Sequence, residues 1–475
     1  MFSTLKIRFV SATAVAFGLA VCAQAAVQET EAALVARAKG IHERVITLDT
    51  HDDISPNNFR PECNYTMRLT TQVNLPKMVE GGLDVSFMIA YVGQGPLTPE
   101  GFDNAYKQVV AKFDAVHLLT KELAPNQIGL ALTPDDVRKI AASKRKVAVI
   151  GIENGYPIGT DIKRVKEFWD RGGRYMSLAH NGHSQLADSN TGEANNQWLH
   201  GGLSPLGKQV IAEMNRWGIM VDVSHPSKAA NLQAIGLSKA PVIASHSAAR
   251  ALANHSRNLD DEQLWAIKQN GGVVQTVAFA SYVRVADPAR QTAINALNQE
   301  FGITAGGGRG AGGGGAGGGG GGRGQGGGGT PACNVEQPGA EATGRGGGRG
   351  GGGGGGANAA LDALTPERRA QYDMRMLAIN ARYPVAPRST VKDFVDHIDY
   401  LVKYIGIDHV GISSDFDGGG GVDGWNSAAE TFNVTLELVR RGYGEKAIAK
   451  LWSGNLLRVW RDVEKVAKRL QADNE

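Results

Sequence analysis

Length, composition and charge place this chain among ordinary globular proteins and exclude few functions. Its 475 residues are 42% hydrophobic and 20% charged, which is typical of a folded soluble protein. The formal net charge of +3 is too small to indicate binding to nucleic acid or to a membrane surface. A chain of this length can hold one large α/β barrel or about two to three domains of average size.

The N-terminus has the pattern of a secretory signal peptide. Lys6 and Arg8 precede a short apolar run over residues 9–21, and the small residues at 23–25 form a cleavage site. The apolar run is too short for a good membrane span, and an uncleaved anchor is the alternative. We therefore predict a signal peptide over residues 1–25 and an exported protein, periplasmic or secreted. The charged C-terminal segment carries no hydrophobic tail that would signal a lipid anchor.

The three cysteines are too few and too scattered to form a metal site. Cleavage of the signal peptide would remove Cys22 and leave Cys63 and Cys333. In an oxidising compartment these two residues could pair, although nothing in their spacing requires it.

A glycine-rich tract from Gly302 to Gly356 interrupts the sequence. It holds half of the chain's 64 glycines, and it cannot bury enough apolar surface to offset the entropy of ordering its backbone. An RNA-binding segment rich in arginine and glycine is the alternative, but the tract has no interleaved aromatic residues and export removes the usual partner. We expect a disordered surface insertion within a single domain formed by residues 26–475.

Eight short and mostly apolar runs alternate with helical patterns along the rest of the chain. Continuous apolar runs are typical of strands buried on both faces of a parallel sheet. The predicted strands cover residues 45–51, 83–92, 147–153, 175–180, 219–225, 241–246, 272–283 and 409–415. Eight strand–helix units predict an α/β fold of the (β/α)8 TIM-barrel type, with a doubly wound open sheet as the alternative. The glycine-rich tract then lies between strands seven and eight, where added loop length costs little.

Capping residues mark several of the helices between these strands. Ser204 and Pro205 predict the start of a helix that ends before Gly218. Thr365 and Thr390 occupy the same capping position before two later helical segments.

Most of the predicted strands end in a polar residue. These residues are His51 and Asp53 on the first strand, Glu153 on the third, His180 on the fourth, His225 on the fifth, His246 on the sixth and Asp415 on the eighth. In a barrel, the C-terminal ends of all strands meet at one mouth, where the loops build the active site. An open sheet would spread these residues over too wide a line, so the pattern favours the barrel.

Five of these residues predict a metal centre without thiolate ligands. Charges at the edge of an apolar core cost several kcal/mol each unless they are paired or bound to a metal. His51 and Asp53 lie two residues apart, so on one strand they point to the same side and can reach one ion. His225 and His246 come from neighbouring strands and could hold a second ion, which Glu153 could bridge to the first. Nitrogen and oxygen ligands suit zinc, with manganese, iron or cobalt as alternatives, and we predict two Zn²⁺ per chain.

Each of these residues also has a structural interpretation when it is taken alone. A histidine at the end of a strand is more often hydrogen-bonded than metal-bound. Asp53 could cap the following helix, and Glu153 could pair with an arginine. The combination of all five residues indicates the metal centre.

Two ions bridged by a carboxylate predict a hydrolase. Such a centre holds a shared water or hydroxide and polarises the group that it attacks. His180 is not needed as a ligand and could stabilise an oxyanion. Asp415 could move a proton to a leaving amine, with Asp417 as its rival in that role.

The sequence motifs around these residues are, in chain order, D-T-H-D-D, G-I-E-N-G, S-L-A-H-N, D-V-S-H, S-H-S, H-S-R-N and H-V-G-I-S-S-D-F-D-G, followed by G-N-L-L-R-V. Together they resemble the membrane (renal) dipeptidase family of zinc metallopeptidases. The resemblance covers nearly the whole mature chain except residues 302–356. It implies an amidohydrolase-type barrel with two zinc ions, which hydrolyses dipeptides.

The resemblance also implies roles for individual residues. It assigns the same five metal ligands and the same bridging carboxylate that the spacing indicates. It implies that His180 contacts the tetrahedral intermediate, that Arg257 pairs with the free carboxylate of the substrate, and that Asp415 shuttles a proton. A guanidinium suits the second role because it can bind a carboxylate bidentately. The family further implies a homodimer.

Two alternatives to a dipeptidase follow from the same residues. The first is a hydrolase of another amide, such as an acyl-amino acid or a lactam. The second is an inactive, metal-bound scaffold whose glycine-rich tract binds a partner. Asp52 and Asn154 stand where many family members have asparagine and glycine, and neither change removes a ligand. The insertion is the larger departure, because loops at the mouth of a barrel shape substrate access.

Overall fold

A nearly closed barrel of eight parallel strands forms the centre of the computed structural model, which describes residues 29–303, 334–336, 360–361 and 363–473. In order round the barrel the strands are β1 (Leu48–Asp53), β4 (Val85–Tyr91), β6 (Lys146–Glu153), β7 (Gly173–Ser177), β8 (Met220–Asp222), β9 (Ile243–Ser247), β10 (Val273–Val277) and β11 (Val410–Ser413). The first and last strands meet where the Asp53 N–H donates to the Phe416 carbonyl at 2.8 Å. The predicted (β/α)8 architecture is confirmed, and the open sheet is wrong.

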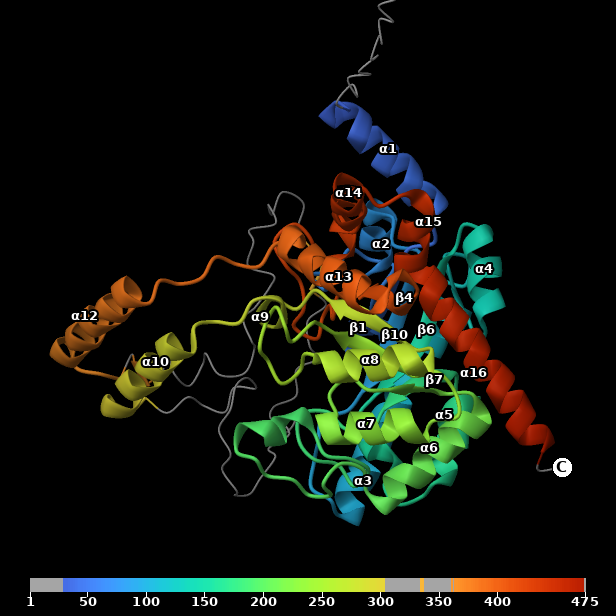
Figure 1. The fold of residues 1–475 in the computed structure, drawn as a ribbon, viewed down its shortest axis with the longest axis horizontal. Coiled ribbons are helices and arrows are strands. Elements are labelled where there is room, and N and C mark those ends of the chain that lie inside the picture. The colour runs from blue at the N-terminus through green and yellow to red at the C-terminus, as the bar shows by residue number, and fades with distance from the viewer. Residues whose placement is uncertain (1–28, 304–333, 337–359, 362, 474–475) are drawn as a thin grey trace, which may run out of the picture.

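Helices surround the barrel (Figure 1). They are α1 (Glu31–Arg44), α2 (Leu75–Gly81), α3 (Pro99–Leu118), α4 (Pro134–Ala142), α5 (Lys163–Asp170), α6 (Pro205–Trp217), α7 (Lys228–Leu237), α8 (Asp261–Asn270), α9 (Ala280–Val283), α10 (Pro288–Glu300), α12 (Pro366–Arg382), α13 (Val391–Ile405), α14 (Phe432–Arg440), α15 (Glu445–Ala449) and α16 (Asn455–Ala472). The three predicted helix starts are confirmed, since Ser204, Thr365 and Thr390 each accept a hydrogen bond from the first turn. In the described part of the chain, no helix is both long and apolar enough to cross a membrane.

Two apolar layers hold the barrel together. Alternate residues of a strand face opposite sides, so Val85 and Phe87 of β4 point into the barrel while Met88 packs against the surrounding helices. Helix α16 contributes Trp460 and Val463 to the inner layer, together with residues from the first positions of several strands. The helix therefore closes the N-terminal end of the barrel and leaves the C-terminal end as its mouth.

Three short strands and one helix depart from the sequence prediction. Strand β5 (Ile128–Leu130) pairs with the first residues of β6, and β2 (Phe59–Arg60) pairs with β3 (Cys63–Asn64) in the loop after β1. The predicted seventh strand over 272–283 is too long. Strand β10 ends at Val277, and α9 takes up the last four residues of the predicted run.

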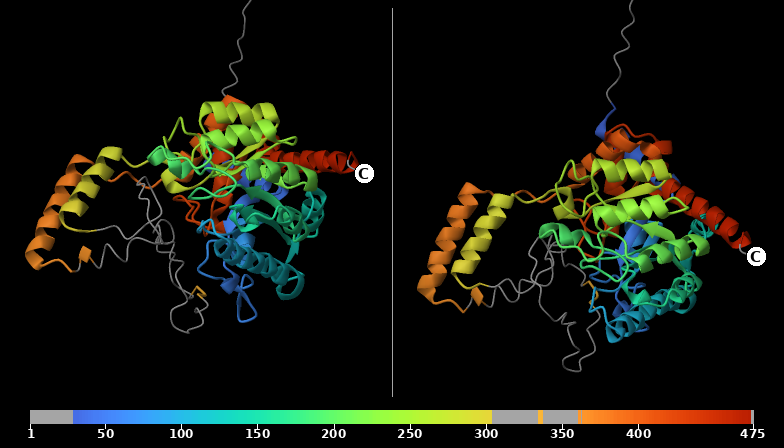
Figure 2. Two further views of the ribbon diagram at one scale, coloured as in Figure 1. Left: turned by 90° about the horizontal axis from the view of Figure 1, so that it is seen from below. Right: turned by 60° about the horizontal axis from the view of Figure 1, so that its bottom comes forward.

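Helices α10 and α12 form a hairpin that extends away from the barrel (Figures 1 and 2). The two helices pack through a small apolar cluster that includes Leu297, Phe301 and Tyr372. This hairpin and the predicted insertion both belong to the connection between β10 and β11. Most of the insertion (302–356) and the whole predicted signal peptide (1–25) lie outside the described residues.

One described segment of the insertion contacts the loop that follows β1. The Thr70 N–H donates to the Asn334 carbonyl at 2.7 Å, and the Glu336 carboxylate pairs with Lys77 at 2.5 Å and with Arg68 at 2.8 Å. In the same loop Cys63 is disulfide-bonded. The other two cysteines lie outside the described residues, and with them the pairing of Cys63 and Cys333 that the sequence leaves open.

Candidate metal centre

The mouth of the barrel brings the predicted site residues together. His51 and Asp53 lie at the end of β1, Glu153 ends β6, His246 lies in β9, and His180, His225 and Asp415 follow the ends of β7, β8 and β11 within three residues. His225 and Asp415 have left-handed backbones, with φ of +81° and +61°. Such conformations are unfavourable for residues other than glycine, and they persist where the surrounding structure enforces them. The backbone therefore bends sharply to aim these two side chains.

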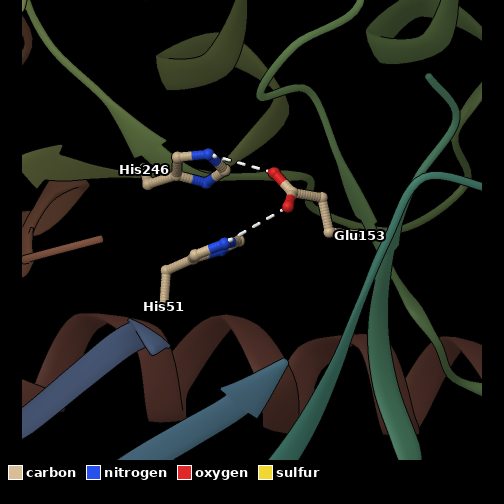
Figure 3. A group of neighbouring side chains, drawn as sticks. All are labelled: His51, Glu153 and His246. Carbon is tan, nitrogen blue, oxygen red and sulfur yellow. Dashed lines mark ion pairs between the residues drawn. The ribbon is translucent and has the colours of Figure 1, made fainter. Parts of the chain in front are cut away.

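Glu153 lies at the centre of the cluster, with imidazoles on both of its oxygens (Figure 3). Its Oε1 atom is 2.8 Å from His225 Nε2 and 3.3 Å from His246 Nε2. Its Oε2 atom is 3.6 Å from His51 Nε2. The two nitrogens of His225 and His246 are themselves 3.0 Å apart. Several lone-pair donors thus converge on one small volume.

Three overlapping groups of side chains have the geometry of metal ligands. They are His51, Glu153 and His246; Glu153, His180 and His225; and His51, Asp53 and Asp415, and the ligand atoms of each group lie within 4.8 Å of one another. Although His51 is only 1% exposed, its Nε2 atom has no hydrogen-bond partner among the described residues. A buried polar atom without a hydrogen bond is costly unless it binds something, so the donor set fits a cation.

Hydrogen bonds behind two of the imidazoles select the form that binds metal. The Ser245 hydroxyl donates to the Asp222 carboxylate at 2.6 Å, so at 2.8 Å it accepts the Nδ1 hydrogen of His246. In the same way, the Tyr175 hydroxyl donates to the Thr50 carbonyl at 3.0 Å and accepts from His51 Nδ1 at 2.9 Å. In both rings the Nε2 atom is left facing Glu153. Outer hydrogen bonds of this kind orient histidine ligands in metal sites.

The protonation of the cluster suits cation binding. Burial lowers the pKa values of His225 and His246 well below the ordinary value, so both imidazoles are neutral at pH 7. The positive charge of Arg257 adds to this effect at His225, and that of His51 adds to it at His246. Burial by itself would raise the pKa of Glu153, but the neighbouring histidines hold it well below its ordinary value. Burial by itself would lower the pKa of His51, but the charge of Glu153 raises it to about 10, so without a cation this imidazole carries a proton. The cluster therefore offers two neutral imidazoles and an ionised carboxylate, which are the forms that bind metal, and a third imidazole whose proton a cation would displace.

Asp415 and its rival Asp417 differ in their surroundings. The Asp417 carboxylate accepts hydrogen bonds from the Gln72 N–H at 2.8 Å and the Val73 N–H at 3.2 Å, so it holds a loop in place. Asp415 instead lies beside His51 and Asp53. Burial raises its pKa well above the usual range. Asp415 is thus the better placed of the two to exchange a proton at the centre.

His180 and Arg257 border the cluster. His180 Nε2 is 3.8 Å from Glu153 Oε1. The Arg257 guanidinium donates to the His246 carbonyl at 3.1 Å and lies 5.4 Å from the ring centre of Tyr282. Arg257 is only 4% exposed, and its Nε atom has no hydrogen-bond partner among the described residues. A buried guanidinium with an unused donor is suited to bind an anion.

The family model for membrane dipeptidases (Peptidase family M19) matches residues 35–474. The chain belongs to the membrane dipeptidase family. The resemblance found in the sequence motifs is therefore confirmed, and the chain is a metallodipeptidase, a hydrolase.

Relatives of this dipeptidase support the same assignment. The dipeptidase tcpJ of Claviceps purpurea (strain 20.1) is 27% identical over 416 residues, which are 86% of this chain and 73% of that protein. The dipeptidase aclJ of Aspergillus oryzae (strain ATCC 42149 / RIB 40) is 26% identical over 452 residues, 91% of this chain and 83% of that protein. The crystal structure of the probable dipeptidase PvdM from Pseudomonas aeruginosa is 31% identical, with a TM-score of 0.71, and the match covers 92% of this chain and all of that one.

Several residues of this dipeptidase's centre were not found from the sequence. Tyr175 and Ser245 lie inside apolar strands, and Asp222 ends a strand that the sequence extends to His225. No local signal separates Tyr175 and Ser245 from core residues. An acid at the end of an apolar run, however, was the signal that selected Glu153, and it could have selected Asp222 as well.

Proposed function

We propose that this metallodipeptidase is binuclear, with His51 and Asp53 holding one zinc ion, His225 and His246 holding the other, and Glu153 bridging the two. The observation that carries the proposal is the position of Glu153, whose two oxygens face imidazoles of opposite ligand pairs at 2.8 and 3.6 Å. A carboxylate between two pairs of nitrogen and oxygen ligands is the arrangement that a bridged pair of cations requires.

The bound ions would supply a bridging hydroxide as the nucleophile and would polarise the scissile amide carbonyl. The protein's own residues then have separate tasks. Arg257 binds the free carboxylate of the dipeptide and fixes its orientation. His180 donates a hydrogen bond to the oxyanion that develops on the carbonyl oxygen. Asp415, whose raised pKa lets it carry a proton, transfers that proton to the leaving amine.

We further propose that the enzyme acts outside the cytoplasm as a single mature domain, residues 26–475, and that it forms a homodimer. The apolar N-terminal run followed by small residues supports export. The disulfide bond at Cys63 supports it independently, because such bonds persist in oxidising compartments.

The test combines metal analysis with turnover. The purified enzyme should contain two zinc ions per chain, should hydrolyse unblocked dipeptides, should lose that activity with a chelator and should regain it with zinc. The Glu153→Gln variant should lose zinc, and its kcat/KM should fall by more than about 100-fold. Loss of a residue that only orients a metal ligand already costs up to about 100-fold, and loss of a ligand should cost more. Glu43→Gln, at an exposed position of α1, is the matched control and should leave both unchanged.

The result also separates the alternative functions. A dipeptidase that recognises the free amino group of its substrate rejects N-blocked dipeptides, whereas a hydrolase of acyl-amino acids prefers them. Full activity after complete removal of metal would refute the proposal. Zinc binding without turnover of any amide would favour a scaffold.

A further inference from the structure

Lys112 of α3 places a positive charge near the metal centre. Its ammonium group lies 5.3 Å from the ring centre of Tyr91, the last residue of β4. The side chain is half-buried, and within the described part of the chain its ammonium has no hydrogen-bond acceptor and no ion-pair partner. Contact with an aromatic face holds a cation in place but does not neutralise its charge.

The contacts of Tyr91 connect this ammonium to the reacting side of the centre. Tyr91 pairs with Glu153 between β4 and β6, and its ring lies 4.7 Å from the ring of His180. Burial lowers the pKa of Lys112, whereas the charges of Asp53 and Glu153 act to raise it. Lys112 is therefore close enough to the centre to interact electrostatically with its carboxylates.

Lys112 and Arg257 approach the centre from opposite sides. Lys112 follows β4, the second strand of the barrel, and Arg257 follows β9, the sixth. In a ring of eight strands the second and sixth face each other across the mouth. A dipeptide whose carboxylate binds Arg257, with its amide over the centre, would direct its N-terminal residue towards Tyr91 and Lys112.

We propose that Lys112 is a specificity-determining residue that selects dipeptides with an anionic side chain on the N-terminal residue. The inference rests on the proposed function, because it needs the substrate orientation that Arg257 sets. A carboxylate on that side chain gives the unpaired ammonium a counter-ion. A cationic side chain at the same place is repelled, and a neutral side chain leaves the ammonium without a counter-ion.

The test compares substrates of equal size and different charge. Zinc-loaded wild-type enzyme should hydrolyse glutamyl-alanine with a kcat/KM about tenfold above that for glutaminyl-alanine, which corresponds to about 1.4 kcal/mol. Lys112→Gln should bring the two values together, and Lys112→Glu should shift the preference to lysyl-alanine. Lys112→Arg should keep the preference for the glutamyl substrate. The matched control is Lys107→Gln, at an exposed position of the same helix, which should behave as wild type.

The outcomes distinguish this inference from the proposed function. A wild-type preference that survives in Lys112→Gln, or the absence of any such preference in active wild type, overturns the role of Lys112 alone. An equal loss of turnover for both substrates in Lys112→Gln also overturns it, since Lys112 then only positions Tyr91. If zinc-loaded wild type hydrolyses no dipeptide, the proposed function fails and this inference fails with it.

Discussion

Replacing Tyr175 by phenylalanine removes one hydroxyl group from the interior of the barrel and tests the assignment of His51 as a ligand. The Tyr175 oxygen is 2.9 Å from His51 Nδ1 and 3.0 Å from the Thr50 carbonyl. All three groups are buried. The change is otherwise small, because the ring that packs against Phe87 is kept.

The magnitude follows from the two groups that lose their partner. A buried donor or acceptor left unsatisfied costs about 1–3 kcal/mol. With one donor on His51 and one acceptor on Thr50, the free energy of unfolding of the metal-free protein should fall by about 2–6 kcal/mol. The His51 ring also loses the bond that fixes its tautomer, so zinc affinity should fall by about 10–100-fold.

Two measurements separate these effects. Urea unfolding of the metal-free protein gives the stability, and competition with a fluorescent chelator at pH 7 gives the zinc affinity. Tyr443→Phe is the control, because its hydroxyl donates at 2.6 Å to Asp399 of α13, a helix outside the barrel. That variant should lose stability but keep its zinc affinity. If Tyr175→Phe loses stability and binds zinc as tightly as wild type, His51 is not a ligand that Tyr175 orients, and the reasoning is wrong.

Three further predictions concern other parts of the molecule. Asp415→Asn should lower kcat by about 100-fold or more, with KM and zinc content retained. The control variant Asp417→Asn should leave kcat nearly unchanged. Loss of zinc from Asp415→Asn would show instead that Asp415 is a metal ligand. Burial lowers the pKa of His397 below its ordinary value of 6.5, so the unfolded state binds the extra proton and stability falls as the pH drops below about 6.5. His397→Gln should flatten this dependence in urea unfolding at pH 5.5 and 7.5, and an unchanged slope would contradict it. Mass spectrometry of non-reduced peptides should find Cys63 joined to Cys333, because the segment that follows Cys333 pairs with the loop that contains Cys63; a free thiol at Cys333 would disprove the pairing.

Much of the barrel and its centre could be predicted because the signals are local. The apolar run over 147–153 matches β6 within one residue, and its terminal Glu153 stands at the mouth as predicted. A strand buried on both faces must be apolar throughout, so a charged residue at its end is visible in the sequence alone. Since parallel strands all end at the same rim, these local signals were enough to predict that residues from six strands meet at one place.

The exact ends of the strands were less predictable. His225 and Asp415 follow strands that stop earlier than the apolar runs suggest, and they are aimed by left-handed backbone turns. A short apolar run has the same composition whether its last residues pair in a sheet or turn away from it. The choice depends on the register with the neighbouring strand, which the run itself does not encode.

The sequence by itself determined the fold class, the family and the set of residues at the mouth, because each is marked by a pattern within a few residues of the chain. Only the tertiary structure decided which groups support and flank them. Tyr175 meets His51 across 124 positions of sequence, and Lys112 of the outer helix α3 reaches Tyr91, beside His180. Such contacts exist only once the strands have closed into a ring, because closure alone sets which side chains of distant segments face each other.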